Sequence, residues 1–293
     1  MEIAVIMTVF NRCESTLRSL DSVEESLKHC GKVAIHAYIT DDGSTDSTSE
    51  MVSQRGYSFP ITFIEGTGNL FWNGGMNAAW KAAIDDGGYD GYLWLNNDTE
   101  VFPDLWNEII RTDSYSVSNF GKHGVYVGST MDPVTGAFTY GGFDFTNKIT
   151  LKDRFKIPDG SVQQCQCGHG NVTFISAEVV KQLGILPTDY IHGGGDHDYT
   201  YNAHRKGFPV LVPGSYVGKC VNDHEDDGYA EFFSMPLKKR LAYLKSPVGF
   251  NLHNTIVFQK RFFPYRLPFV VMTAYMKTLF PKTYMGIYKL LRK

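Results

Sequence analysis

The sequence predicts an α/β fold built on a parallel sheet, and three observations support this. Four short apolar runs, at residues 3–9, 33–40, 61–64 and 91–95, are typical of strands buried on both faces. Segments with helical spacing of apolar residues separate these runs, and a polar or glycine-rich loop follows each one. Strands that alternate with helices indicate right-handed crossovers, so the strands are expected to be parallel.

The helices of the first half are placed by their apolar spacing and their flanking turns. The first lies between positions 11 and 31, where leucine and valine recur at intervals of three and four residues. A second is expected after Asp41–Asp46, whose side-chain oxygens can cap a helix. A loop rich in glycine and asparagine is expected over 66–75, and a third helix over 76–84.

The pattern changes from about residue 124 to short strands and turns, at 125–129, 138–140 and 172–175, which predicts a mixed or antiparallel half. A helix is expected to begin near Asp196, directly after three glycines. We therefore expect one continuous domain over 1–231, built on a mixed sheet flanked by helices. Its nucleotide-binding half is expected over about 1–100 and its acceptor half over about 101–231. A basic helical tail over 232–293 completes the chain.

The net charge of −3 conceals a strong asymmetry between the two parts of the chain. Residues 232–293 contain twelve Lys or Arg and no Asp or Glu, whereas residues 1–231 contain 16 basic and 31 acidic residues. Aromatic residues lie among the basic ones, as in segments that rest on anionic lipid. The longest apolar stretch, 267–276, is interrupted by Pro268 and is far shorter than the roughly 20 residues that span a bilayer.

The tail is therefore expected to lie on an anionic membrane without crossing it. Nucleic-acid binding is disfavoured, because the first part of the chain is acidic and no recognition motif is present. Five cysteines, an odd number spread thinly, argue against a disulfide framework and favour a reducing compartment. The first residues lack the pattern of a signal peptide. These features predict a cytoplasmic protein, peripheral on the inner face of the cell membrane.

One cysteine cluster resembles part of a zinc site. Cys165, Cys167 and His169 have partial ligand spacing, but no second ligand pair follows at the usual interval, so buried thiols are the preferred interpretation. The four tryptophans are expected mostly in the core. Trp72, which lies in the predicted glycine- and asparagine-rich loop, is the candidate for contact with a ligand.

Four loops are expected to meet at the carboxyl edge of the sheet, where open α/β folds bind ligands. They offer an aromatic face, a carboxylate able to accept from a nucleobase, glycines for close backbone approach, and an oxygen-rich corner for a divalent cation. These loops contain Thr8–Arg12, Asp41–Ser44, Gly68–Asn77 and Asn96–Asp98. The combination suits a nucleoside diphosphate.

Five segments, in this order, resemble the inverting family 2 glycosyltransferases with the GT-A fold, which use nucleotide-sugar donors. The resemblance covers about residues 3 to 226. Its segments are Val5–Arg12, Asp41–Asp46, Gly68–Asn77, Leu95–Thr99 and Gly194–Tyr199. Any one of these alone is a weak signal; the five together are specific.

The resemblance implies roles for the residues around the donor. Thr8, Phe10 and Arg12 would line the nucleoside pocket. Asp42 would hydrogen-bond the base, with Asp41 nearby. The residues that would border the donor diphosphate are Asn73, Gly74 and Asn77.

The resemblance also implies a divalent cation, Mn²⁺ or Mg²⁺, at the donor diphosphate. Asn96, Asn97 and Asp98 occupy the place of the family's Asp-x-Asp motif, but only Asp98 is a carboxylate. Asp98 would be the main protein ligand, and His224 resembles a late histidine that completes such sites; a histidine ligand favours Mn²⁺. The cation would stabilise the negative charge that develops on the departing diphosphate.

For catalysis, an inverting transfer needs a base that removes the proton of the attacking acceptor hydroxyl. Asp196 is the chosen base, since the family's Glu-Asp pair here reads Gly195-Asp196. Asp198 is the alternative base, or a residue that orients Asp196. Taken alone, each of these carboxylates is also compatible with simple helix capping, and the Asp41–Ser44 segment with a turn.

The sequence therefore predicts an inverting, metal-dependent glycosyltransferase that moves a hexosyl or deoxyhexosyl group to a hydroxyl of a saccharide acceptor. Membrane attachment suggests a lipid-linked acceptor, as in O-antigen or capsule assembly, and the motifs resemble rhamnosyltransferase-like enzymes. UDP-linked and dTDP-linked donors both remain open. The alternatives are a carbohydrate-binding scaffold of the same fold that has lost catalysis, and a sugar-nucleotide nucleotidyltransferase, which would need a basic glycine-rich loop that Thr8–Asn11 does not provide.

Overall fold

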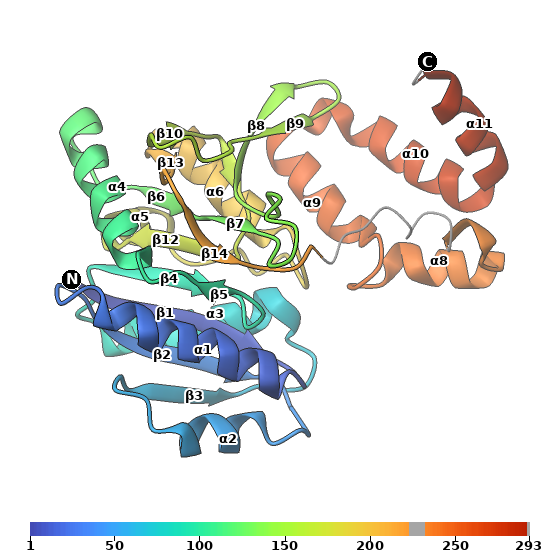
Figure 1. Ribbon diagram of the computed structural model, residues 1–293. Coiled ribbons are helices and arrows are strands. Elements are labelled where there is room, and N and C mark those ends of the chain that lie inside the picture. Colours follow the sequence, from blue (N-terminus) through green and yellow to red (C-terminus); the bar gives the residue numbers. More distant parts are fainter. Residues whose placement is uncertain (223–231, 292–293) are drawn as a thin grey trace. The chain divides into compact units, whose positions relative to one another are not determined.

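The computed structural model describes residues 1–222 and 232–291. The chain forms two compact units (Figure 1). The first comprises Met1–Thr188 and Gly195–Asn222, and the second comprises Asp189–Gly194 and Asp223–Lys293, of which 189–194 and 232–291 are described. The expected boundaries at 231 and 232 stay a prediction.

An eight-stranded mixed sheet forms the centre of the first unit, in the order β10-β13-β6-β12-β4-β1-β2-β3. The pairs β4-β1, β1-β2 and β2-β3 are parallel, as the alternating pattern predicted, and β12 is antiparallel to both β4 and β6. The strands are β1 (Glu2–Val9), β2 (Ala34–Asp41), β3 (Ile61–Glu65), β4 (Gly91–Leu95), β6 (Val125–Val127), β10 (Gln163–Gln164), β12 (Val172–Ser176) and β13 (Val210–Val212). The predicted mixed α/β fold is confirmed.

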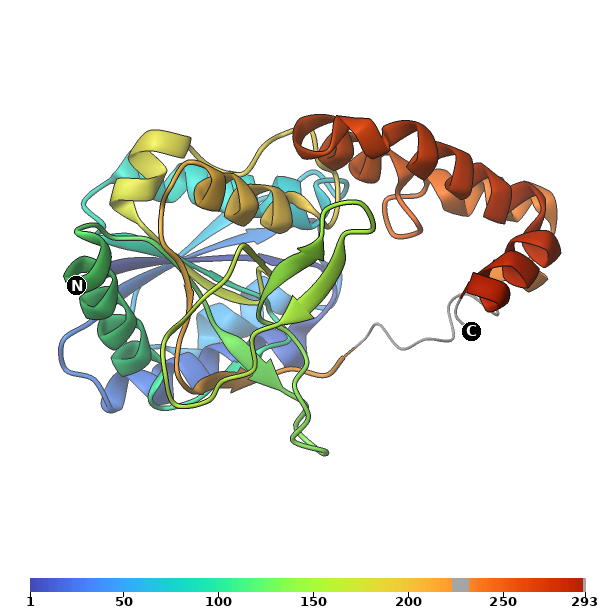
Figure 2. The ribbon, with the colours of Figure 1, turned by 90° about the horizontal axis from the view of Figure 1, so that it is seen from above.

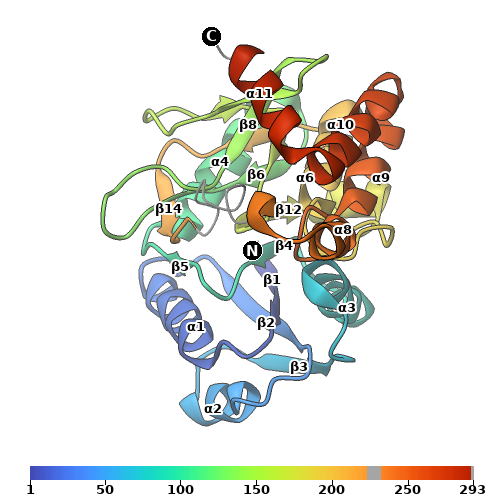
Figure 3. The ribbon, with the colours of Figure 1, turned by 90° about the vertical axis from the view of Figure 1, so that its right-hand side faces the viewer.

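Helices cover both faces of the sheet, because β1 and β4 are apolar on both sides. Odd-numbered β1 residues such as Val5 pack in one core with α1 (Cys13–Lys28), α2 (Thr48–Arg55) and α4 (Leu105–Phe120). Even-numbered residues such as Ile6 pack in a second core with the opposite helices. These are α3 (Phe71–Asp86), α5 (Ala177–Leu183) and α6 (Gly195–Arg205). Figure 2 shows α5 and α6 on the face opposite α1 and α4, and Figure 3 shows α1 and α3 on opposite sides of β1 and β2.

Two three-stranded sheets complete the first unit. One has the order β11-β8-β9, and the other has the order β5-β14-β7. Their strands are β5 (Glu100–Val101), β7 (Ser129–Met131), β8 (Gly142–Asn147), β9 (Lys152–Phe155), β11 (Cys167–Gly168) and β14 (Tyr216–Lys219). The strand expected at 125–129 is therefore split between two sheets. The strand expected at 138–140 is wrong: only an isolated bridge between Phe138 and Met131 forms there.

The largest difference from expectation lies at 66–75, where a loop was predicted. Helix α3 begins at Phe71, so the second half of this segment is helical. Glycine and asparagine are poor helix formers, which is why the sequence favoured a loop. The helix starts early because a side chain distant in sequence, Asp42, accepts from the backbone N–H groups of Leu70 and Phe71.

From residue 232 onward, the described part of the second unit is mainly helical. Its elements are α8 (Leu237–Lys245), α9 (Leu252–Phe262), η1 (Pro264–Arg266), α10 (Leu267–Leu279) and α11 (Pro281–Leu291). Pro268 lies in the first turn of α10, where its missing N–H costs no helical hydrogen bond. Among the described helices, none has the length and apolar character required to cross a membrane.

An aromatic core holds this unit together. Phe232 is fully buried and packs against Tyr243 and Phe250. Lys277 from α10 places its ammonium group 3.8 Å from the centre of the Phe250 ring. Burial lowers the pKa of Lys277. The face of the Phe250 ring attracts the positive charge of the ammonium group and so opposes this effect.

Candidate active site

The carboxyl ends of β1, β2 and β4 lie at one edge of the sheet, and their loops meet there. Thr8 and Val9 pair in register with Thr40 and Asp41, so the β1 and β2 loops leave the sheet together. The side chain of Arg12, after β1, forms an ion pair with Asp98, after β4, with 2.9 Å between Nη1 and Oδ2. The structure therefore brings the predicted nucleoside loop and the predicted metal ligand together.

The loops after β1 and β2 are also joined directly. The amide oxygen of Asn11 accepts from the backbone N–H of Thr45 at 2.7 Å. Asn11 has a φ of +49°, in the left-handed region that asparagine tolerates better than most residues. Phe10, directly before Asn11, is 55% exposed, which leaves an aromatic face at this edge of the sheet. Its role in lining the nucleoside pocket stays a prediction.

Asp42 is buried and organises the start of α3. One carboxylate oxygen accepts from the backbone N–H of Gly68 at 2.8 Å, and the other accepts from Leu70 at 2.8 Å and Phe71 at 3.0 Å. Phe71 has a φ of +54°, a strained conformation for an aromatic residue, and these bonds hold it there. Gly66 lies so close that an added Cβ would be 2.7 Å from the Asp42 Cα.

The predicted contact between Asp42 and a base therefore coexists with a structural role. A carboxylate has about four acceptor positions, of which three are used here. Asp41 is engaged as well, because it accepts from the backbone N–H of Ser44 at 2.8 Å and from the Ser49 hydroxyl. Both aspartates shape the loop that would hold a nucleoside.

The two asparagines after β4 point in different directions. Asn96 accepts from the indole N–H of Trp72 at 2.8 Å, which ties α3 to the β4 loop. Asn97 is only 9% exposed and donates to the Thr16 hydroxyl at 3.2 Å. The Asn96 side chain therefore contacts the start of α3, whereas the Asn97 side chain contacts α1.

The first turns of α3 hold three further predicted donor residues. Asn73 is 1% exposed and donates to the carbonyl of Pro187 at 2.9 Å. Asn77 is partly buried, and its amide oxygen has no hydrogen-bond partner among the described residues. Gly74 is packed near Leu70, where an added Cβ would lie 3.2 Å from the Leu70 Cβ.

A close approach between α3 and β1 depends on a glycine that sequence reasoning did not single out. A Cβ at Gly75 would lie 2.1 Å from the Thr8 hydroxyl oxygen. The carbonyl of Gly75 also accepts from the Thr40 hydroxyl at 2.8 Å. Glycine at this position lets α3 approach the ends of β1 and β2, beside the predicted nucleoside residue Thr8.

Asp98 is the predicted metal ligand that the described part of the chain includes. The described residues include no group of three or more His, Cys, Asp or Glu side chains that could hold a metal. The side chain of Asp98 is 28% exposed, and its Oδ2 pairs with Arg12. His224, the other predicted ligand, lies outside the described residues. One carboxylate with diphosphate oxygens is a donor set that Mg²⁺ and Mn²⁺ accept.

Asp196 lies in the first turn of α6, as predicted. Its carboxylate accepts from the backbone N–H of Gly170 at 3.0 Å, and its side chain is 15% exposed. Burial disfavours the charged form, but nearby His197 and His169 and the backbone N–H groups of His197 and Gly170 outweigh it, so the pKa of Asp196 is lowered. The carboxylate is therefore ionised at neutral pH, as a base must be.

Gly170 places Asp196 next to Trp72. A Cβ at Gly170 would lie 2.8 Å from the Trp72 ring and 3.3 Å from the Asp196 Cβ. Since Trp72 also binds Asn96, an unbroken set of contacts leads from Asp98 and the β4 loop to Asp196. Trp72 follows directly on Phe71, whose backbone N–H donates to Asp42. That Asp42, Asp98 and Asp196 border one binding site stays a prediction.

Two histidines beside Asp196 were not predicted as site residues. The rings of His169 and His197 are 5.0 Å apart, and His197 Nε2 is 3.9 Å from the Asp196 carboxylate. An aromatic group packs around them, formed by Tyr140, Phe143 and Phe155. The signal for His169 was its spacing from Cys165 and Cys167, but that spacing suggested only zinc; nothing in the sequence linked it to Asp196.

The two cysteines themselves are buried thiols, as expected. Cys165 is 3% exposed and Cys167 is fully buried, and burial raises the pKa of Cys165 to about 12. Asp198, the alternative base, is 1% exposed. This burial leaves Asp196 as the more accessible of the two carboxylates.

Comparison with known proteins identifies the class of fold. Residues 4–123 match glycosyl transferase family 2. A mannosyltransferase from Pyrobaculum calidifontis, in complex with GDP-Man and Mn²⁺, is 15% identical; the match covers 98% of this chain and 78% of that one, with a TM-score of 0.55. Residues 1–349 of S. aureus TarS, in complex with UDP-GlcNAc, are 11% identical; the match covers 89% of this chain and 71% of that one, with a TM-score of 0.53.

These findings confirm the predicted resemblance to family 2 and the GT-A fold. A comparison with curated proteins by sequence finds no match. The chemistry of this chain therefore has to be argued from its own residues.

Proposed function

From a chain whose N-terminal region is that of glycosyl transferase family 2, we propose that this protein is an inverting glycosyltransferase. It transfers a sugar from a nucleotide-sugar donor to a hydroxyl of a saccharide acceptor. The observation that carries the proposal is the position of Asp196, an ionised and partly exposed carboxylate beside Trp72, at the end of the contacts that begin at Asp98. In this proposal Asp196 is the base, and Asp98 is the cation ligand at the donor diphosphate.

In the proposed reaction the acceptor oxygen attacks the anomeric carbon and forms the new glycosidic bond. The bond from that carbon to the donor phosphate breaks, and the nucleoside diphosphate leaves with the bonding electrons. The acceptor proton passes to the Asp196 carboxylate. Direct displacement with a single base gives inversion at the anomeric carbon.

Asp98 and Arg12 would help to stabilise the negative charge of the leaving nucleoside diphosphate. When bound, a divalent cation would neutralise charge that builds up on the diphosphate oxygens. Asp98 would hold that cation, and Arg12, 2.9 Å from Asp98, would be free to move to a phosphate oxygen. The Mn²⁺ in the mannosyltransferase complex supports a cation in this fold.

The donor and acceptor classes follow from the sequence prediction. We propose a UDP- or dTDP-linked donor and a lipid-linked acceptor, with the helical second unit on the inner face of an anionic membrane. Surface-polysaccharide assembly, such as O-antigen or capsule, is the process that this combination suits. Two solved structures of this fold hold GDP-Man and UDP-GlcNAc, so thermal-shift measurements with UDP, dTDP and GDP will rank the bases.

Replacing Asp196 tests the proposal. We expect Asp196→Asn to lower the rate of transfer by a factor of about 10² to 10⁴, the usual contribution of a general base, while donor affinity changes little. Release of nucleoside diphosphate and donor binding should be measured separately. Asp189→Asn, at a position outside the proposed mechanism, is the matched control.

Full activity of Asp196→Asn would remove Asp196 as the base. If the unmodified protein bound donor but released no nucleoside diphosphate with or without acceptor, the scaffold alternative would replace the enzyme. That alternative is raised by the single carboxylate in Asn96–Asp98 and by glycine in place of the family's glutamate at Gly195.

A further inference from the structure

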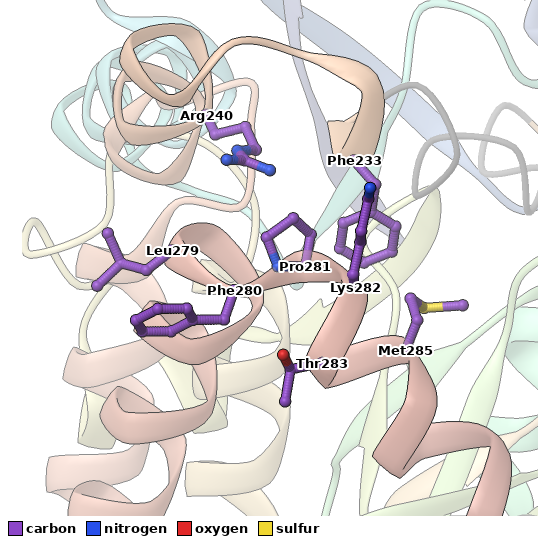
Figure 4. A pocket seen from close by; sticks show the side chains of 8 residues that line it. All are labelled: Phe233, Arg240, Leu279, Phe280, Pro281, Lys282, Thr283 and Met285. Atoms are coloured by element: carbon purple, nitrogen blue, oxygen red, sulfur yellow. The ribbon is translucent and has the colours of Figure 1, made fainter.

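The second unit contains a cavity of about 500 Å³ that none of the predicted site residues lines. Figure 4 shows its eight side chains, which come from the segment before α8, from α8, and from the end of α10 through the first turn of α11. They are Phe233, Arg240, Leu279, Phe280, Pro281, Lys282, Thr283 and Met285. All of them belong to the second unit, so the cavity is a property of that unit alone.

Two cationic side chains line this cavity, and none of the eight described residues that line it is an Asp or Glu. Arg240 reaches it from α8 and Lys282 from α11. Arg240 Nε is buried and has no hydrogen-bond partner among the described residues. Residues 232–293 contain no Asp or Glu, so no acid in this segment can pair with the two charges. A buried, unpartnered guanidinium N–H is costly unless a ligand accepts from it.

Apart from Thr283, the remainder of the lining is apolar. Phe233, Leu279, Phe280 and Met285 surround the two cationic groups with hydrocarbon. Phe280 is 61% exposed and Leu279 is 42% exposed, so the apolar side of the cavity opens to its surroundings. The cavity therefore suits an anion that carries a hydrocarbon chain, and not a small hydrated ion alone.

We propose that this cavity binds the headgroup of a lipid phosphate monoester. A phosphate monoester carries a charge of about −1.5 to −2 at pH 7, which two cationic side chains can match. Arg240 and Lys282 would donate to the phosphate oxygens, and the hydroxyl of Thr283 supplies a third donor. The chain of the lipid would lie along Leu279 and Phe280. The inference rests on the membrane contact proposed above and names the headgroup, but it does not depend on sugar transfer.

The test is calorimetric titration of the full chain, without donor, with monododecyl phosphate below its micelle concentration. We expect saturable binding that Arg240→Gln with Lys282→Gln weakens by about tenfold or more, since two charge-assisted contacts are lost. The matched control is Lys238→Gln with Lys239→Gln, which removes two charges from exposed positions of α8 that do not line the cavity. That control should bind within about twofold of the unmodified chain.

Lys282→Gln alone tests whether lost binding comes from misfolding, because Lys282 is exposed. Its circular dichroism spectrum should be unchanged while its affinity for monododecyl phosphate falls.

Two further ligands distinguish the possible sources of the anion. Inorganic phosphate that binds as tightly as monododecyl phosphate would overturn the lipid assignment. Dodecylphosphocholine that binds equally well would overturn the role of the phosphate charge. Equal loss in both double variants would show diffuse charge attraction instead of a site.

Because these titrations contain no nucleotide sugar, their failure leaves the glycosyltransferase proposal intact. Conversely, an inactive protein that still binds monododecyl phosphate would separate the lipid site from the reaction.

Discussion

At the scale of single residues, the ion pair between Arg12 and Asp98 occupies the carboxylate that we propose as the cation ligand. The two side chains are 51% and 28% exposed, and exposed ion pairs contribute about 0 to 1 kcal/mol. The charge of a donor diphosphate outweighs so weak a pair. We therefore expect Arg12 to exchange Asp98 for phosphate when the donor arrives, which releases Asp98 for the cation.

Replacing Asp98 should uncouple donor binding from the metal. With Mn²⁺ present, Asp98→Ala is expected to weaken donor affinity by about tenfold, or about 1.4 kcal/mol, because one hard oxygen ligand is lost. Without metal, affinity should change little. Titration calorimetry with UDP, dTDP and GDP measures both conditions, and Asp104→Asn at an exposed position is the control. Equal metal dependence in Asp98→Ala and the unmodified chain would contradict this role.

The sequence predicted some residues of the candidate site and not others. Asp196 could be predicted because its segment resembles a family motif and follows three glycines. His169 could not, since its proximity to Asp196 arises only when β11 and the segment after it pack against the start of α6. His197 directly follows Asp196, but nothing in the sequence assigned it a role at the site. Asn97 lies within the predicted metal-binding motif, yet its amide donates to the Thr16 hydroxyl. The spacing of the motif does not reveal this orientation of the side chain.

At the scale of elements, the start of α3 shows why local propensity misled the prediction. The sequence around Gly74 and Gly75 is unfavourable for a helix, and the prediction placed the helix start at residue 76. Asp42 supplies the missing cap from about thirty residues away. The strands and the other helices of the first half depend on local apolar spacing, and they formed close to where the sequence placed them.

Removing the charge of Asp42 should loosen this start. Asp42→Asn keeps the size of the side chain but turns an NH₂ group toward backbone N–H groups, so we expect unfolding free energy to fall by about 2 kcal/mol. Asp85→Asn, on an exposed turn of the same helix, should leave stability nearly unchanged. Urea unfolding followed by circular dichroism measures both. A loss of less than about 0.5 kcal/mol in Asp42→Asn would argue against the cap.

Helix α10 presents the apolar surface that membrane contact requires. Phe269 and Met272 are 59% and 55% exposed, one turn apart on the helix. Changing both to Asp should reduce flotation with phosphatidylcholine–phosphatidylglycerol vesicles by at least about tenfold, because burying each apolar side chain contributes about 1.5 to 3 kcal/mol. Val134→Asp with Ile149→Asp, at positions 89% and 74% exposed in the first unit, is the matched control. Equal flotation of the two double variants would refute the membrane role of α10.

At the scale of the whole molecule, we expect buried tyrosines to make stability depend on pH in the alkaline range. Tyr38, Tyr126 and Tyr199 are at most 2% exposed, and burial, reinforced by neighbouring tyrosine or aspartate groups, raises the pKa of each. In the unfolded chain these phenols ionise near pH 10. A raised folded pKa means that their contribution is complete below pH 10 and is lost as pH rises above it.

We therefore expect the free energy of unfolding to fall between pH 9 and pH 11 by about 1 kcal/mol for each of these tyrosines. Urea titrations at the two values measure the loss. Tyr126→Phe should reduce the pH dependence by about one third of this sum, whereas Tyr115→Phe, at a position 38% exposed, should not. Stability that is constant from pH 9 to pH 11 would contradict the assignment.

The environments of the four tryptophans give the site its own optical reporter. Trp80, Trp94 and Trp106 are fully buried in the two cores, whereas Trp72 is partly exposed and shares its indole N–H with Asn96 beside Asp196. Any ligand that rearranges the Asn96 corner must change the polarity around that one indole and leave the other three in place. The native fluorescence of the unlabelled chain should therefore follow ligand binding beside Trp72.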